Sequence, residues 1–287
     1  GLQVSYFTIK GKGFTGYLKN IFLLRKYLKL NKVDLIHAHY SLSAIVATLS
    51  TSLPVVCSLM GSDIQVKGFL KKIILFFSRY RWKATIVKST RMKRSIGINH
   101  AHVVPNGIDL NNMRIIDKII AQDKTGFESL KKNILFLANP NRYEKNFKLA
   151  QESINLLNKL NNENVELHIV YDIEHDLVPY YLNASDVLLL TSLWEGSPNV
   201  IKEAMACNLP IVSTDVGDVS DIIEKTQGCY ITDFDALDIA DKLEKALAFG
   251  KRTNGRQNIA YLDDNIIAKK LIDIYNQVLH QNQKYEI

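Results

Sequence analysis

Short apolar runs alternate with amphipathic segments along most of this chain, and this alternation limits the possible folds more than any other feature. The runs typical of strands lie at residues 4–9, 33–37, 55–59, 84–87 and 102–104, and again at 133–137, 165–170, 187–190, 211–213 and 229–231. Helical patterns lie at residues 17–30, 42–50, 70–79, 90–96, 146–160, 176–183, 198–207, 219–224, 236–249 and 265–281. Such alternation predicts parallel sheets with helices on both faces.

A polar stretch of weak periodicity at residues 111–132 separates the two sets of alternating runs. The chain has 287 residues, of which 47% are hydrophobic, and this is enough to bury one large core or two ordinary ones. We therefore expect one α/β domain over residues 1–112, a second over residues 113–264, and a final helical segment over residues 265–287.

Residues 185–215 carry the most specific pattern in the chain. Residues 187–190, directly after Asp186, form an apolar run without alternation, as expected of a parallel strand that is covered on both faces. Ser197 and Pro198 form a helix-start pattern, while Asn208 and Pro210 form a helix-stop pattern. Such a strand, loop and helix present free amides at the carboxyl end of a sheet, where the helix dipole favours a negative ligand such as diphosphate.

Two glutamates belong to this segment. Glu195 precedes the predicted helix and Glu203 lies on its second turn, so both carboxylates can accept hydrogen bonds from the hydroxyls of one sugar-containing ligand. The competing interpretation is that both are solvated surface charges, which is the usual situation of glutamate.

The segment from Glu195 resembles the signature of the retaining glycosyltransferases of family 4. That signature reads Glu-Gly-x-Pro, four variable residues, then Glu-Ala-Met-Ala and a strand that starts Pro-Ile/Val-Val, and every element is present here. Four further segments resemble the family in the same order, at residues 34–39, 55–63, 103–109 and 142–146. The resemblance implies the GT-B fold, with two Rossmann-like, doubly wound domains facing a central cleft.

The resemblance also assigns the parts of the chain. Residues 1–112 become the acceptor-side domain, which we expect to be truncated at its N-terminus because the family's first strand and glycine-rich loop are missing before Gly1. Residues 113–264 become the nucleotide-sugar-binding domain, and residues 265–287 become a helix that returns to the first domain.

Family roles transfer onto matching residues. By this resemblance Glu203 binds the nucleotide ribose, Glu195 binds hydroxyls of the donor sugar, and His39 contacts that sugar from the first domain. The backbone near the helix start meets the sugar and phosphate through Gly196, Ser197, Pro198, Asn199 and Val200. Arg142 and Lys145 neutralise the diphosphate, so no metal and no other cofactor is expected. The acceptor side is formed by Gly61, Ser62 and Asp63.

The chain departs from the family pattern at three places. Met60 replaces a histidine that usually precedes the Gly-Ser/Thr-Asp turn, and Arg142 is closer to Lys145 than is common. Residues 170–178 lack the usual turn that helps to hold the base, so the base is not defined. For His37 and His39, a core histidine and a two-ligand metal site are the alternatives, and the lack of a clear third ligand disfavours the metal.

The implied function is retaining transfer of a sugar from a nucleoside diphosphate sugar to an acceptor hydroxyl, in polysaccharide or glycolipid biosynthesis. The acceptor is then a glycan or a lipid-linked sugar. A nucleotide-sugar-binding module without turnover and a nucleotide-sugar isomerase remain as alternatives. Residues 11–16 also fit a dinucleotide fingerprint, but Asp34, the acid at a suitable distance, precedes its strand, so we expect these glycines to form a turn.

Charge is distributed unevenly. Residues 1–100 contain 17 lysines and arginines against Asp34 and Asp63, whereas the remaining residues contain 19 basic and 27 acidic side chains. Residues 67–83 carry six positive charges, no negative charge and many apolar side chains, which suits an anionic membrane surface. The alternative is an ordinary helix packed on its sheet with its lysines in water. Nucleic acid is not expected as a partner, because no recognised binding module accompanies the charge.

Localisation follows from two further observations. No apolar run is long enough to cross a bilayer. The three cysteines are odd in number and widely spaced, which favours structural thiols in a reducing compartment. We therefore expect a cytoplasmic protein that is peripheral at the inner face of the cell membrane.

Overall fold

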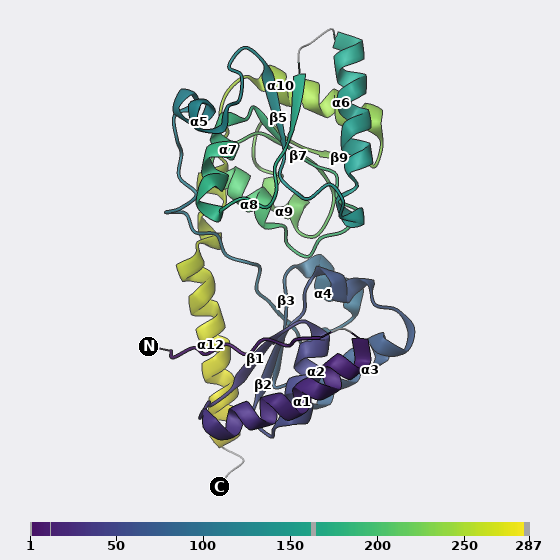
Figure 1. The fold of residues 1–287 in the computed structure, drawn as a ribbon, viewed down its shortest axis with the longest axis vertical. Helices are drawn as coiled ribbons and strands as arrows, with labels where there is room; N and C mark the ends of the chain where they lie inside the picture. The colour runs from purple at the N-terminus through teal and green to yellow at the C-terminus, as the bar shows by residue number, and fades with distance from the viewer. Residues whose placement is uncertain (1, 12, 162–164, 284–287) are drawn as a thin grey trace. The chain divides into compact units, whose positions relative to one another are not determined.

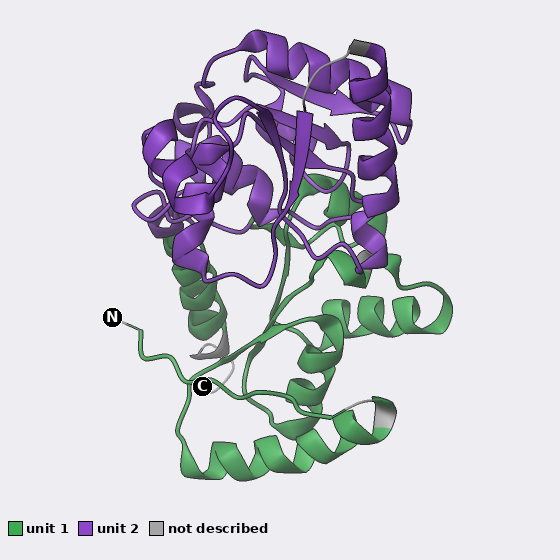
Figure 2. Cartoon of the chain, turned by 45° about the horizontal axis from the view of Figure 1, so that its top comes forward, with its two compact units in different colours: residues 1–105, 268–287 green, residues 106–267 purple. Residues whose placement is uncertain are grey.

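The computed structural model describes residues 2–11, 13–161 and 165–283. The chain forms two compact units, which Figure 2 colours green and purple. Unit 1 combines residues 1–105 with residues 268–287, and unit 2 comprises residues 106–267. The chain first passes from unit 1 to unit 2 between residues 105 and 106, seven residues before the expected boundary at 112. It returns to unit 1 after residue 267. The last four residues of the expected C-terminal segment, 284–287, lie outside the described residues.

Unit 1 contains a parallel sheet with the strand order β1-β2-β3-β4. Figure 1 labels its first three strands. Its strands are β1 (Ile36–His39), β2 (Val55–Ser58), β3 (Ala84–Val87) and β4 (His102–Val103). Its helices are α1 (Gly13–Leu30), α2 (Ser41–Ser50), the short 3-10 helix η1 (Gly61–Gln65), α3 (Gly68–Tyr80) and α4 (Thr90–Ile96). The part of α12 (Asp264–Gln283) from Ala268 onward also belongs to this unit. The α/β prediction is confirmed for the first sheet.

One face of this sheet forms the core of unit 1. Ala38, Val55, Cys57 and Val87 alternate with residues of the other face and pack together with Ile74 of α3. α3 is also fixed by a hydrogen bond between Ser78 Oγ and Thr85 Oγ1 at 2.8 Å. Because the core occupies this face, the residues in alternate positions of the strands remain on the opposite face, where function can use them.

The expected first strand, residues 4–9, is wrong. Residues 2–10 have no regular secondary structure, although Phe7 and Ile9 pack against the core while Val4 and Tyr6 are exposed. This alternation explains the expectation, but no ladder of hydrogen bonds joins the segment to β1. The expected glycine turn is found in part. Gly11 lies in a bend with a φ of 110°, whereas α1 already begins at Gly13 and includes Gly16. Lys12 lies outside the described residues.

Unit 2 contains a second parallel sheet, with the order β6-β5-β7-β8-β9. Its strands are β5 (Lys132–Phe136), β6 (Val165–Ile169), β7 (Val187–Leu190), β8 (Ile211–Thr214) and β9 (Cys229–Thr232). Its longer helices are α5 (Lys118–Thr125), α6 (Phe147–Asn161), α7 (Val178–Ala184), α8 (Asn199–Ala206) and α10 (Ala236–Phe249). Shorter turns of helix are η2 (Tyr143–Lys145), η3 (His175–Leu177), α9 (Val219–Ile223), α11 (Gly255–Asn258) and η4 (Ala260–Leu262).

The central strand β7 shows why this sheet forms. All four of its residues are buried, as the unbroken apolar run predicts for a strand covered on both faces. On one side, Leu189 of β7 packs together with Ile134 of β5 and Val212 of β8. Ile154 of α6 and Leu243 of α10 belong to the same core. The carboxyl ends of β5, β7 and β8 therefore lie next to one another at one edge of a rigid sheet.

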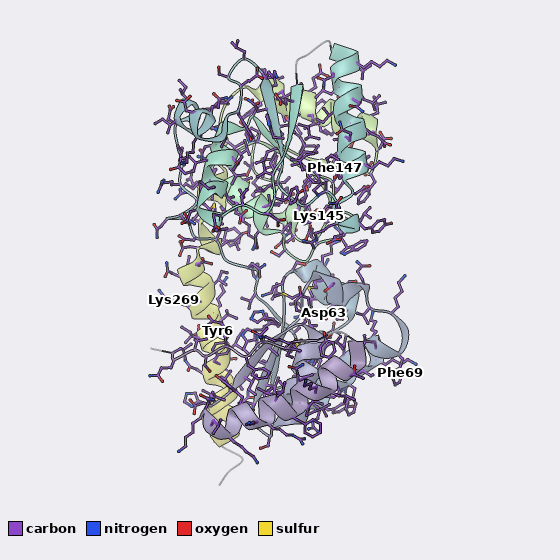
Figure 3. The ribbon with its side chains drawn as sticks, in the orientation of Figure 1. Tyr6, Asp63, Phe69, Lys145, Phe147 and Lys269 are labelled. Carbon is purple, nitrogen blue, oxygen red and sulfur yellow. The ribbon has the colours of Figure 1, made fainter. Side chains whose placement is uncertain are left out.

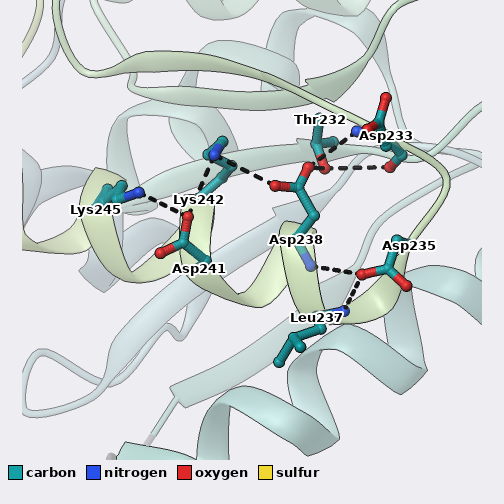
Figure 4. Close-up of polar contacts among 8 residues, drawn as sticks. All are labelled: Thr232, Asp233, Asp235, Leu237, Asp238, Asp241, Lys242 and Lys245. Carbon is teal, nitrogen blue, oxygen red and sulfur yellow. Dashed lines mark hydrogen bonds and ion pairs between the residues drawn. The ribbon is translucent and has the colours of Figure 1, made fainter.

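Side-chain caps fix where helices begin. Figure 4 shows the start of α10, where Asp235 accepts hydrogen bonds from the backbone amides of Leu237 and Asp238 at 3.0 and 2.8 Å. The Asp238 carboxylate turns back to accept a bond from Thr232 Oγ1 at the end of β9, at 2.6 Å. The acid at the cap satisfies amides that have no partner within the helix, which explains why α10 begins at Ala236.

Candidate functional site

The loops that follow β5 and β7 meet at the carboxyl edge of the second sheet. Lys145, at the end of η2 and labelled in Figure 3, forms an ion pair with Glu195, with 2.6 Å between Nζ and Oε1. Ser192 Oγ donates a second hydrogen bond to the same oxygen, at 2.9 Å. The two charged side chains are only 13% and 18% exposed, so water screens their attraction weakly. Glu195 is therefore held in one orientation by a cation.

Hydrogen bonds to backbone carbonyls hold the same two loops together. Thr191 Oγ1 donates to the carbonyl of Lys145 at 3.0 Å, and the amide of Leu193 donates to the carbonyl of Glu144 at 2.8 Å. The sequence predicts Arg142 and Lys145 as a pair, but the structure directs them differently. Arg142 lies at the surface and binds Glu144, with Nε 2.7 Å from Oε1. Lys145 is the cation that the structure brings to Glu195.

The loop after β7 continues into α8 without the expected serine cap. The helix begins at Asn199, and Pro198 takes the capping position without a side-chain bond. Ser197 Oγ instead donates to Asp218 Oδ2 at 2.6 Å. Asn208 ends the helix region with a positive φ of 54°, as predicted. The first amides of a helix have no partner within it, so the start of α8 still offers donors beside Glu195.

Glu203 lies on the second turn of α8, on the same element that presents the loop. Its side chain is 12% exposed, and its Oε1 is 3.5 Å from Nε2 of His175 in η3. Burial raises the pKa of Glu203, and the hydrogen bond from His175 opposes that rise. A buried carboxylate that is bonded at one oxygen by an exposed histidine retains capacity to accept bonds from a ligand.

A buried lysine, Lys202, lies at the centre of this region and is not among the residues predicted from the sequence. Lys202 is 0% exposed and donates through Nζ to Ser197 Oγ at 2.5 Å and to the carbonyl of Asn106 at 2.9 Å. Ser197 in turn donates a hydrogen bond to Asp218. Burial raises the pKa of Asp218, and the positive charge of Lys202 opposes part of that rise. One signal was available: Lys202 directly follows the buried Ile201 in a helix whose neighbours are mostly apolar.

Glycine is required where the loop after β8 approaches the loop after β7. Gly217 has a φ of 61°, and a Cβ on it would lie 2.9 Å from the carbonyl oxygen of Gly196. A side chain at position 217 would therefore displace Gly196 and the adjoining Glu195. The close approach of the two backbones orients the loop that precedes α8.

The candidate residues of unit 1 occupy the carboxyl end of the first sheet. His37 and His39 stack with ring centroids 4.7 Å apart. His37 also contacts the hydroxyl of Tyr275 through Nδ1 at 2.5 Å and Ser58 Oγ through Nε2 at 2.8 Å. Burial first, and then the charges of His39 and Lys88, lower the pKa of His37 to about 3. His37 is therefore a neutral, fully bonded ring that supports the more exposed His39.

The turn at Gly61, Ser62 and Asp63 forms the start of η1. Asp63, labelled in Figure 3, is buried and accepts bonds from the Ser41 hydroxyl at 2.6 Å, the Ser41 amide at 3.2 Å and the Met60 amide at 2.7 Å. Its carboxylate thus holds the start of α2 against η1. Among the residues that the structure describes, no group of three or more histidine, cysteine, aspartate or glutamate side chains could hold a metal ion.

Comparison with known proteins finds that this chain is similar to glycosyltransferases. The model described as "Glycosyltransferase Family 4" matches residues 3–112, and the model described as "Glycosyl transferases group 1" matches residues 170–248. A putative teichuronic acid biosynthesis glycosyltransferase, TuaC of Bacillus subtilis, is 27% identical over 74% of this chain and 61% of its own length. The chain therefore spans less than two thirds of that relative.

A second relative has a more specific name. The UDP-Gal:alpha-D-GlcNAc-diphosphoundecaprenol alpha-1,3-galactosyltransferase of Escherichia coli is 24% identical, over 77% of this chain and 68% of its own length. Among solved structures, sucrose-phosphate synthase from Thermosynechococcus elongatus superposes with a TM-score of 0.76 at 18% identity, covering 93% of this chain and 79% of that one. At this identity the structural likeness concerns the fold.

Proposed function

Because this chain belongs to glycosyltransferase family 4 and has the GT-B fold, we propose that it transfers a sugar from a nucleoside diphosphate sugar to an acceptor hydroxyl in polysaccharide or glycolipid biosynthesis. The observation that carries the proposal is the ion pair of Lys145 with Glu195 beside the start of α8, with Glu203 one helical turn further along. A cation, two carboxylates and a helix start on one sheet edge suit a ligand that combines hydroxyls with a diphosphate.

The proposed binding follows from these positions. Glu203 accepts hydrogen bonds from the ribose hydroxyls, and Glu195 accepts them from the donor sugar. Lys145 lies close enough to Glu195 to reach the diphosphate that joins those two parts, with Arg142 as a surface cation nearby that pairs with Glu144. In this arrangement the protein's own cations neutralise the leaving group, and a metal is not required.

The proposed chemistry retains the configuration of the sugar. The bond between the anomeric carbon and the diphosphate oxygen breaks, and its electron pair remains on that oxygen. The acceptor hydroxyl attacks from the same face and passes its proton to the leaving phosphate oxygen. Lys145 stabilises the negative charge that develops on the diphosphate, which is usually the largest contribution in such reactions.

The acceptor is proposed to be a lipid-linked sugar or a growing glycan. The Escherichia coli relative acts, by its name, on a sugar that is joined by diphosphate to undecaprenol. The test incubates the protein with radiolabelled nucleotide sugars and diphosphate-linked sugar acceptors, and analyses the anomeric configuration of the product. Saturable nucleotide binding without product would favour a binding module. Donor consumption without acceptor would favour an isomerase, and an inverted linkage would contradict retention.

Glu203→Gln is expected to weaken nucleotide binding by about tenfold or more, because bonds to a charged acceptor are replaced by weaker ones. The raised pKa of Glu203 means that the folded protein holds the proton more tightly than the unfolded chain. The stability from this group is therefore lost as the pH rises through the raised pKa. At about pH 7.5 the variant should have a higher Tm but bind nucleotide more weakly.

Thermal shift and calorimetry with nucleoside diphosphates measure both effects. Glu244→Gln, an exposed glutamate of α10, is the matched control and should change neither quantity. Equal nucleotide affinity in Glu203→Gln and the natural protein would contradict the assignment of the ribose site.

We also propose that unit 1 binds an anionic membrane surface through α3. No helix in the described part of the chain is long and apolar enough to span a membrane. One face of α3 packs on the sheet through Ile74 and Ser78, while Phe69, Phe76 and Tyr80 on the other face are 78%, 53% and 64% exposed. Figure 3 labels Phe69 at the edge of this unit.

Cations flank the exposed aromatic side chains of α3. Lys72 and Arg79 are exposed on the same side of the helix, and no acid occurs in residues 67–83. Aromatic rings that insert at the headgroup level, together with positive charge, are typical of interfacial helices. Internal packing and membrane binding by residues 67–83 are therefore compatible, because one face of α3 packs on the sheet and the other faces solvent.

Vesicle sedimentation tests this surface. The protein should bind vesicles that contain phosphatidylglycerol more tightly than pure phosphatidylcholine vesicles, and less tightly at high salt. Lys72→Gln should weaken binding about fivefold, and Phe69→Ser with Phe76→Ser should weaken it further. Phe234→Ser, an equally exposed aromatic side chain of unit 2, is the control. Equal binding to neutral vesicles would exclude the electrostatic contribution.

A further inference from the structure

A buried cation in unit 1 has no counter-charge among the residues that the structure describes. Lys88 directly follows β3 and is 7% exposed. Its ammonium makes no hydrogen bond or ion pair with any residue that the structure describes, and burial alone lowers its pKa. Lysine is seldom buried unless it is paired, because burial removes the water that solvates its charge. An anionic ligand would supply the missing partner.

The strand register places Lys88 beside the two histidines. His39 pairs with Ser58, and Ser58 pairs with Ile86, so these residues share one face at the carboxyl end of the sheet. Lys88 lies two residues after Ile86, so its side chain is on the same face of the sheet. The hydrogen bond between His37 and Ser58 shows that these two residues share that face. The positive charge of Lys88 contributes to the lowered pKa of both histidines.

A strained turn adjoins the same position. Tyr40 has φ 73° and ψ 144°, a conformation that costs free energy in a residue with a side chain and that clusters at ligand sites. The Asp63 carboxylate secures the turn through Ser41, and both of its oxygens are occupied by bonds from Ser41 and Met60. The turn directs the start of α2, a helix of ten residues, toward the end of β1.

We propose that Lys88 and the amides of Leu42 and Ser43, which follow the Asp63-bound amide of Ser41 at the start of α2, form a subsite beside His39 for a phosphate or diphosphate group of the acceptor. The subsite rests on the proposed function, and it defines the acceptor as one that carries a phosphate near the attacking hydroxyl. Lysine ammonium groups and helix-start amides are both common phosphate donors in proteins. Both histidines are neutral at physiological pH, so neither repels Lys88. The ring nitrogens of His37 are occupied by Tyr275 and Ser58, so His39 is the histidine that can bond to the ligand.

The test uses inorganic pyrophosphate as the probe, in a Lys145→Met background that removes the cation of the donor site. Pyrophosphate should raise the Tm of this protein, and the additional change Lys88→Met should weaken pyrophosphate binding by about tenfold or more. Without any anion, Lys88→Met should raise the Tm, because an unpaired buried charge is replaced by an apolar side chain of similar length. Lys32→Met, an exposed lysine of the same unit, is the control.

Two results would overturn the subsite. One is unchanged pyrophosphate binding after Lys88→Met, and the other is a lower Tm of that variant without anion, which would show that Lys88 has a structural partner. Farnesyl diphosphate and inorganic phosphate distinguish the sources of the anion. Tighter binding of farnesyl diphosphate indicates a lipid-linked acceptor, whereas equal binding of inorganic phosphate indicates a free phosphate.

Nucleotide binding separates this proposal from the function on which it rests. If nucleoside diphosphates bind through Glu203 while Lys88→Met leaves pyrophosphate binding unchanged, the subsite alone is wrong. If nucleotide sugars do not bind but pyrophosphate binding depends on Lys88, the proposed transfer is wrong and the anion site remains. In a working transfer assay, Lys88→Met should raise the KM for the acceptor and leave the KM for the donor unchanged.

Discussion

Replacement of Lys145 by methionine is expected to lower the rate of sugar transfer by about a hundredfold or more. Lys145 forms an ion pair with Glu195, and both side chains are largely buried. When the diphosphate leaves, its growing negative charge requires a fixed positive group that does not have to be reorganised. The variant also leaves Glu195 without its cation, so the carboxylate that we propose to orient the donor sugar would lose its fixed position.

The matched control is Lys148→Met, one turn further along the chain on α6. That lysine is 87% exposed, and its pair with Glu152 spans 3.7 Å. We expect it to retain full activity, since exposed ion pairs contribute little. Turnover and nucleotide affinity should be measured separately, because Glu195→Ala is expected to lower turnover more than affinity. Full transfer activity of Lys145→Met would exclude its part in leaving-group stabilisation.

The sequence predicts the elements whose burial pattern is unambiguous. Strand β7 matches the expected residues 187–190, because a run of apolar residues without alternation fits one environment only. Helix α4 matches residues 90–96, with Ser89 capping its first turn through the amide of Met92 and Gly97 ending it at φ 83°. Local chemistry alone determines both ends of that helix.

Other elements depend on partners that the sequence does not reveal. Residues 4–9 alternate like a strand, yet a strand requires a neighbour to complete its hydrogen bonds. α5 was missed although Asp117 and Gly126 mark its ends, because Ile119 and Ile120 are exposed and break the expected apolar face. Tertiary context decided both cases.

The candidate site shows the same division. The helix-start pattern at Ser197 correctly places α8 within one residue, but the serine hydroxyl binds Asp218 instead of the helix amides. That choice depends on Lys202 and Asp218, which lie 16 residues apart in the chain and meet through Ser197. A spacing rule finds the loop and the helix, whereas the buried network that orients the loop follows from three-dimensional packing.

Lys202→Met is expected to destabilise the protein by about 3–5 kcal/mol, because removing one partner leaves a buried charge uncompensated. Lys202 is fully buried and binds Ser197 and the carbonyl of Asn106, and Ser197 in turn binds the buried carboxylate of Asp218. Asn106 is the first residue of unit 2, and its side chain also donates to Asn199 Oδ1 at 3.1 Å. The loss should therefore also loosen the start of α8 and weaken nucleotide binding.

Urea denaturation of Lys202→Met, of Lys202→Met with Asp218→Asn, and of the exposed control Lys225→Met separates the two causes of instability. The double variant should regain a large part of the lost stability, because its second change removes the unpaired negative charge. If instead the single variant loses less than about 1 kcal/mol, the buried lysine is not electrostatically coupled to Asp218. If stability recovers in the double variant while nucleotide binding does not, the positive charge itself orients the loop that contains Glu195.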